Sequence, residues 1–224
     1  MDKMLLAFSN QFKMVEKNPN ATRSTAITLE LHSRIHDVVE SLVDSEYQIH
    51  SQKNKEISIK GAFLSKKADI AIVKGNEVIG VIEVKAIRSS YKKNATNYFY
   101  NMIGETSNLQ TANIPVCQII LIPSIVQTRS AGKTSYETIG DTQLQKYLTL
   151  STSEDNPSKP KGMIVSVLDV DYEDNFNCAF STLENFSSDM KDFLTLSGSD
   201  ISKSIETFVK EEVLNNKGGV EWAK

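Results

Sequence analysis

Three charged residues in two neighbouring apolar segments are the group in this sequence best suited to chemistry. Asp69 lies in the apolar run 68–73, and Glu83 and Lys85 lie inside the longer run 78–87. The second run is continuous and rich in β-branched residues, which is typical of a strand buried on both faces. Because side chains alternate along a strand, Glu83 and Lys85 emerge on the same face. Burial of such charges is costly, so we expect them to pair with each other or to hold a metal or a substrate.

The polar segment 74–77 between the two runs predicts a tight turn and therefore a β-hairpin. In such a hairpin Asp69 stands near Glu83, which brings two carboxylates beside Lys85. Carboxylate oxygens suit Mg²⁺, and the ammonium group suits a phosphate held over the metal. The alternative is a structural Glu83–Lys85 ion pair, with Asp69 capping a turn.

Asp69, thirteen intervening residues and then Glu83-Val84-Lys85 resemble the motif of the PD-(D/E)xK nucleases, the restriction-endonuclease-like superfamily. The proline that usually precedes the aspartate is Ala68 here. A bare Glu-x-Lys occurs by chance in most proteins of this size, so the resemblance depends on the surrounding elements. An amphipathic helix precedes the hairpin and a polar helix follows it. The resemblance implies an α/β fold with a restriction-endonuclease-like three-layer core, in which helices flank a mixed central β-sheet.

The resemblance also implies a reaction, the Mg²⁺-dependent hydrolysis of DNA phosphodiesters to 5′-phosphate and 3′-hydroxyl ends. Asp69, Glu83 and the backbone carbonyl of Val84 are the implied metal ligands. Lys85 is implied to orient or activate the attacking water and to stabilise charge on the phosphate.

The clearest helical pattern covers residues 25–43, whose apolar side chains fall on one stripe. The superfamily often takes a glutamate from this helix to hold a water molecule on the metal. Glu30 borders the stripe and is the candidate, whereas Glu40 points away; an ordinary boundary carboxylate is the alternative for Glu30. His32 and His36 project to the polar side and are expected to be solvated.

Composition predicts a single domain over residues 1–224, with a core over about 25–170 and a helical addition over about 183–215. Two isolated cysteines do not make a disulfide framework, and no apolar run reaches the length of a membrane span. We therefore expect a cytoplasmic protein with no membrane partner.

Basic residues concentrate around the proposed site, although the net charge of the chain is −3. Segment 51–67 holds five lysines and one acid, and it is expected to be a loop that either follows a phosphate backbone or is simply solvated. Within it, residues 57–59 alternate enough to form a strand or an irregular β segment. Segment 124–140 is expected to be a flexible polar loop. The residues expected to contact DNA are Lys66, Lys67, Arg88, Lys92, Lys93, Asn94, Asn97, Asn101, Arg129 and Lys133.

A row of asparagines lies along one face of a predicted helix over about 91–110. Asn94, Asn97, Asn101 and Asn108 are members of this row, together with Glu105. Asparagine is a poor helix former, so some other interaction should compensate for its presence. Asparagine amides read adenine edges well, which predicts a face that contacts bases. The alternative is that these amides satisfy buried backbone groups of neighbouring loops.

Further strands are predicted over 116–122 and 163–170, and further helices over 141–150, 183–196 and 201–215. Within the superfamily, the extra loops and C-terminal helices favour a type II restriction endonuclease, which implies a homodimer that reads a palindromic site in double-stranded DNA. A repair, recombination or mobile-element nuclease with little sequence preference is one alternative. A non-catalytic DNA-binding module with the same fold is the other.

Overall fold

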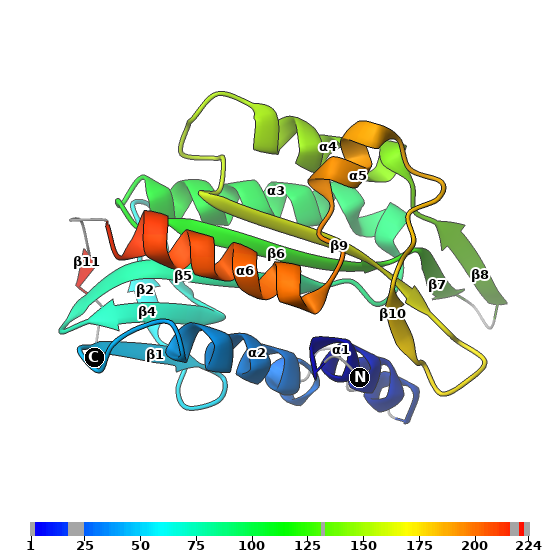
Figure 1. Ribbon diagram of the computed structural model, residues 1–224, viewed down its shortest axis with the longest axis horizontal. Coiled ribbons are helices and arrows are strands. Elements are labelled where there is room, and N and C mark those ends of the chain that lie inside the picture. The colour runs from blue at the N-terminus through cyan, green and yellow to red at the C-terminus, as the bar shows by residue number, and fades with distance from the viewer. Residues whose placement is uncertain (1–2, 18–24, 131–132, 216–219, 222–224) are drawn as a thin grey trace.

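A mixed β-sheet forms the middle layer of the molecule (Figure 1). The computed structural model describes residues 3–17, 25–130, 133–215 and 220–221. In spatial order the strands of the sheet are β1 (Tyr47–Ser51), β4 (Ile70–Lys74), β5 (Glu77–Ala86), β6 (Val116–Pro123), β9 (Gly162–Val170) and β10 (Cys178–Phe180), and β11 (Val220–Glu221) pairs with the start of β5. The central strands β5, β6 and β9 are parallel, whereas β1, β4 and β10 run antiparallel to their neighbours.

Helices cover both faces of this sheet, which confirms the predicted layered α/β architecture (Figure 1). One face carries α1 (Lys3–Lys17), α2 (Thr25–Glu40) and α6 (Gly198–Phe208), and a π-helical stretch, η2 (Val209–Val213), continues α6. The other face carries α3 (Tyr91–Gln110), α4 (Asp141–Thr152) and α5 (Ser188–Phe193). Alternation along the strands separates the two apolar clusters: Ile119 of β6 packs towards α1, α2 and α6, and Ile120 packs towards α3 and α4.

The predicted hairpin is present and consists of β4 and β5. Lys74 pairs with Glu77, and Gly75 in the turn between them has a φ of 61°, a conformation that glycine adopts without steric cost. Ile70 pairs with Ile82, so the next residues, Asp69 and Glu83, are neighbours across the hairpin. The register thus confirms the juxtaposition of the two carboxylates.

Two segments predicted as loops are β-hairpins instead. Within 51–67 the structure forms β2 (Ser58–Lys60) and β3 (Ser65–Lys67), and within 124–140 it forms β7 (Ile125–Ser130) and β8 (Lys133–Thr138), a hairpin that projects beyond the end of the sheet (Figure 1). The alternation over 57–59 indicated a short β segment where β2 lies. The other three strands are largely polar, so alternation of apolar residues could not reveal them.

The C-terminal helices differ from the sequence prediction in their lengths. The helix expected over 183–196 is reduced to the six residues of α5, and the last helix begins earlier, at Gly198. The apolar side chains of α6, among them Ile201, Ile205 and Phe208, are buried against the sheet and α2. This face is therefore used within the chain. None of the described helices is both long enough and apolar enough to cross a membrane.

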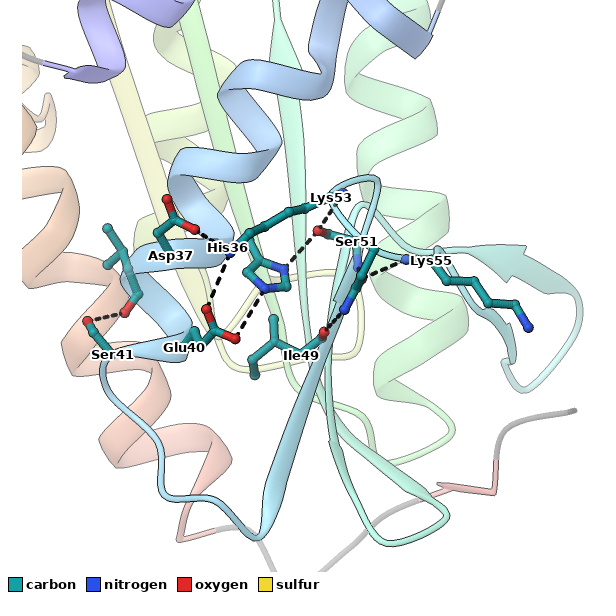
Figure 2. A network of polar contacts seen from close by, with 10 residues as sticks. His36, Asp37, Glu40, Ser41, Ile49, Ser51, Lys53 and Lys55 are labelled. Carbon is teal, nitrogen blue, oxygen red and sulfur yellow. Dashed lines mark hydrogen bonds and ion pairs between the residues drawn. The ribbon is translucent and has the colours of Figure 1, made fainter.

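Both histidines of α2 are buried, so the expectation that they are solvated was wrong. His36 Nδ1 lies 2.9 Å from Ser51 Oγ at the end of β1, and His36 Nε2 lies 3.7 Å from Glu40 Oε1 (Figure 2). Lys53, in the turn after β1, pairs with Asp37 at 2.7 Å. These contacts hold α2 against the end of β1 and the turn that follows it. The histidines are buried because this part of the chain covers the helix face on which they lie.

Candidate active site

A cavity of about 390 Å³ lies between the β4–β5 hairpin, the first turns of α2 and the inner face of α3. Asp69, Glu83 and Lys85 all line it, so the structure brings together the three residues singled out by their spacing. The other lining residues are Thr28, His32, Gln52, Lys66, Lys67, Val84, Tyr98, Met102, Glu105, Gln118, Ile120 and Tyr147. Carboxylates, cations and aromatic rings therefore share one pocket.

The two carboxylates differ in their surroundings. Asp69 Oδ2 accepts the backbone N–H of Val84 at 2.8 Å, which ties the start of β4 to β5. Glu83 is only 6% exposed, and none of the described residues donates a hydrogen bond to its Oε1 atom. Burial, reinforced by the charge of Asp69, raises the pKa of Glu83 to about 8. The site therefore contains a buried carboxylate oxygen that still needs a positive or hydrogen-bonding partner.

Among the described residues, Lys66 of β3 is the cation that pairs with this carboxylate. Its Nζ atom lies 2.8 Å from Glu83 Oε2 and 3.1 Å from Glu105 Oε2 of α3. Burial by itself lowers the pKa of Lys66, but the two carboxylates outweigh it and raise the pKa above its usual value. Lys66 thus stays charged at neutral pH, while Glu83 ionises less readily than an exposed glutamate.

Lys85 is not paired with Glu83, so the alternative of a structural Glu83–Lys85 ion pair is not what the structure shows. The Lys85 side chain is exposed, and its Nζ atom lies 5.7 Å from the centre of the Tyr98 ring. A cation over an aromatic face at this distance is attracted by the ring. The ammonium group is therefore held at the cavity while remaining available to a ligand.

The donor set of the cavity suits a hard cation such as Mg²⁺. Asp69, Glu83 and the Val84 backbone are adjacent, and Glu83 Oε1 is buried without a donor among the described residues. Within the described ranges, no cluster of three or more histidine, cysteine, aspartate or glutamate side chains is placed to hold a metal ion. A hard cation at this place would be held by Asp69, Glu83 and the Val84 backbone, all of which line the cavity.

The structure does not bring Glu30 to the cavity. Its carboxylate accepts a hydrogen bond from Asn10 of α1 at 2.8 Å and lies 3.9 Å from Arg34. Thr28 and His32 line the cavity instead. They are four residues apart on one face of α2, and at 100° per residue Glu30 lies on nearly the opposite face.

His32 lines the cavity, although the sequence predicted that it would be solvated. Its side chain is buried, and its Nδ1 atom has no hydrogen-bond partner among the described residues. Burial lowers the pKa of His32, against the opposing charges of Asp69 and Glu56, so the imidazole is neutral at neutral pH. A neutral imidazole can accept or donate one hydrogen bond at each nitrogen, which suits it to hold a water molecule in the cavity.

The residues predicted to contact DNA occupy different environments. Lys67 is exposed and lines the cavity. The other exposed residues of the set lie outside the cavity lining: Lys92, Lys93, Asn97, Asn101 and Lys133. Lys66 faces inward to Glu83, and burial lowers the pKa of the half-buried Arg88. Arg129 lies in β7, and its side chain is outside the part that the structure describes.

The asparagine row of α3 divides into two classes. Asn97 and Asn101 are exposed, whereas Asn108 is buried and its side chain accepts the N–H groups of Phe63 and Leu64 at 2.8 and 3.0 Å. Its amide also donates to the Leu64 carbonyl. Asn94 donates to the carbonyl of Ser90, the residue that precedes its helix. Asn108 is therefore structural, as the alternative interpretation of the row predicted, and the exposed pair stays available for a ligand.

A second arrangement with catalytic geometry is the chain Ser51–His36–Glu40 (Figure 2). It matches the order of a nucleophile, a base and an orienting acid. The Ser51 side chain is fully buried, however, and its hydroxyl also accepts the N–H of Lys53. A substrate cannot reach this hydroxyl, so the chain is a structural link between α2 and β1.

No protein-family model matches this chain, and no curated protein or solved structure does so either.

Proposed function

We propose that this protein is a Mg²⁺-dependent endonuclease that cleaves double-stranded DNA. The observation that carries the proposal is that Asp69 and Glu83, from adjacent strands, share one cavity with Lys85. Paired carboxylates beside an available ammonium group are the equipment that metal-assisted phosphodiester hydrolysis requires. The layered α/β fold with its mixed sheet agrees with the resemblance to the PD-(D/E)xK nucleases.

Each residue has a separate task in this reaction. Asp69, Glu83 and the Val84 carbonyl would hold Mg²⁺, and the bound ion would supply Lewis-acid stabilisation of the phosphate and a more acidic water. Lys85, presented over Tyr98, lies against the scissile phosphate and offsets the negative charge that grows during attack. His32 orients water through the nitrogen that has no protein partner among the described residues.

Within this class, we propose a type II restriction endonuclease that acts as a cytoplasmic homodimer on a palindromic sequence. Lys67, Lys92 and Lys93 are exposed cations suited to the phosphate backbone, and Asn97 and Asn101 are exposed amides suited to base edges. The apolar face of α6 is buried within the chain, so the dimer contact belongs to another surface.

Incubation of the purified protein with supercoiled plasmid DNA in Mg²⁺ buffer tests the proposal. Discrete fragments support a sequence-specific enzyme, and a smear supports the alternative of a repair, recombination or mobile-element nuclease. Absence of cutting beside retained DNA binding supports the alternative of a non-catalytic module. The matched control is Asp69→Asn, because asparagine keeps an acceptor for the Val84 N–H but removes the charge.

A further inference from the structure

Lys66 is paired with two carboxylates of the cavity. Its ammonium group bridges Glu83 and Glu105 at 2.8 and 3.1 Å, and its side chain is 17% exposed. Asp69 adds a third negative charge close to Glu83. Without a cation here, the charges of Asp69 and Glu105 would oppose ionisation of the buried Glu83 carboxyl group.

We infer that Lys66 is an internal counter-ion that fills the cation position of the metal-free site and releases Glu83 when a divalent cation binds. This inference deepens the proposed function and rests on it. An ammonium group and a dication cannot both sit close to Glu83 without strong repulsion, because charges interact strongly in a partly dehydrated cavity. Metal binding must therefore displace the Lys66 ammonium group from Glu83.

The structure provides an alternative position for the displaced ammonium group. Glu105, its second partner, has a side chain that is 43% exposed, whereas that of Glu83 is 8% exposed. Lysine has a flexible four-carbon stem, so the ammonium group can move towards Glu105 and solvent while β3 stays in place. In that position it is available to a DNA phosphate, which couples the loading of the metal to the arrival of the substrate.

Mn²⁺ affinity measured by isothermal titration calorimetry tests the inference. Lys66→Met keeps the apolar stem and removes the charge, and it should lower the Kd for Mn²⁺ by about tenfold or more, the size of effect that a neighbouring unit charge has on an ionic site. Lys60→Met, at an exposed lysine of the same β2–β3 hairpin that does not line the cavity, is the matched control and should leave the Kd unchanged. Asp69→Asn should remove the binding.

The outcomes separate the inference from the proposed function. Equal Kd values for the wild type, Lys66→Met and Lys60→Met, with binding that still depends on Asp69, would overturn the counter-ion role and leave the metal site standing. If none of the proteins binds Mn²⁺ in a manner that Asp69→Asn abolishes, the metal site and the counter-ion role both fail.

A measurement on the wild-type protein avoids any question of whether Lys66→Met folds. Brief acetylation with acetic anhydride, followed by peptide mass spectrometry, reports the accessibility of each lysine, with Lys67 as the internal reference. Addition of Mg²⁺ should raise the modification of Lys66 relative to Lys67 severalfold. An unchanged ratio at a Mg²⁺ concentration that saturates the site would show that Lys66 keeps its contact with Glu83, and would overturn the inference.

Discussion

Asp69 and Val84 are joined across the β4–β5 hairpin, where the Asp69 carboxylate accepts the Val84 N–H at 2.8 Å. This bond fixes the start of β4 against β5 beside Glu83. It gives Asp69 a structural task in addition to the proposed binding of a metal. Substitutions of Asp69 must therefore be chosen so that the two tasks are separated.

Asp69→Asn should abolish DNA cleavage in Mg²⁺ and change stability little, because the amide oxygen still accepts the Val84 N–H. Asp69→Ala should abolish cleavage and also cost about 1 kcal/mol of unfolding free energy, the usual net contribution of one such hydrogen bond. Plasmid cleavage and urea denaturation measure the two effects. Cleavage at the wild-type rate by either variant would remove Asp69 from the active site.

Lys85 tests the chemistry without disturbing the core, since its side chain is exposed. Lys85→Ala should abolish cleavage while the melting temperature stays within about 1 °C, as expected for a surface substitution. Lys85→Arg should restore little activity, because a wide planar guanidinium cannot replace a compact ammonium group at a crowded phosphate. Full activity of Lys85→Arg would show that only the charge matters at this position.

The pH dependence of stability should report the raised pKa of Glu83. Burial raises its pKa from 4.5 to about 8, so Glu83 binds a proton more tightly in the folded protein than in the unfolded chain. The stability that this group contributes is fully present below pH 4.5 and is lost as the pH rises through about 8. In EDTA, the unfolding free energy of the wild type should therefore fall relative to that of Glu83→Gln between pH 5 and 9, by up to a few kcal/mol, on the order of 1.4 kcal/mol per pKa unit.

Thermal denaturation of the two proteins across this pH range gives the comparison directly. A difference in stability that does not change with pH would mean that Lys66 keeps Glu83 ionised throughout. In that case the ion pair, and not burial, determines the charge of Glu83.

The sequence predicted Glu30 at the active site and His32 in solvent. In the structure, Glu30 contacts Asn10 and Arg34, whereas His32 lines the cavity. Glu30→Gln should therefore cleave DNA at the wild-type rate. His32→Gln should slow cleavage by about a hundredfold, the lower end of the range for loss of a group that positions a reacting proton or water. Single-turnover cleavage measures both; a slow Glu30→Gln with a normal His32→Gln would reverse the assignment.

Local pattern was enough to predict the hairpin and its charged residues, because Asp69, Glu83 and Lys85 are placed by alternation along two strands and one short turn. The same reasoning could not find the Lys66–Glu83 contact. That contact requires β3, a three-residue strand with little apolar signal, to lie over α3 and β5. His32 was missed for a related reason, since the burial of one helix face by the turn after β1 and by the cavity wall is a property of packing and not of helical period.

The asparagine row of α3 offers the clearest separation of scaffold from recognition. Asn108 bonds three backbone groups of the β2–β3 turn, whereas Asn97 and Asn101 are exposed. Asn108→Ala should lower the unfolding free energy by about 2–3 kcal/mol, because it leaves several polar groups without partners. Asn97→Ala and Asn101→Ala should change it by less than about 0.5 kcal/mol and should relax the choice of cleavage site.

Gly61 supplies a matched test of the scaffold, because a side chain at this position would meet the Asn108 amide at 2.2 Å. Gly61→Ala should therefore destabilise the protein as Asn108→Ala does, without altering which sequences are cut. Cleavage of a library of duplexes, sequenced after digestion, would measure site choice for all four variants. A loss of stability in Asn97→Ala and Asn101→Ala with site choice intact would show that the whole row is scaffold. The residues that read the sequence would then have to lie on the β2–β3 or β7–β8 hairpins.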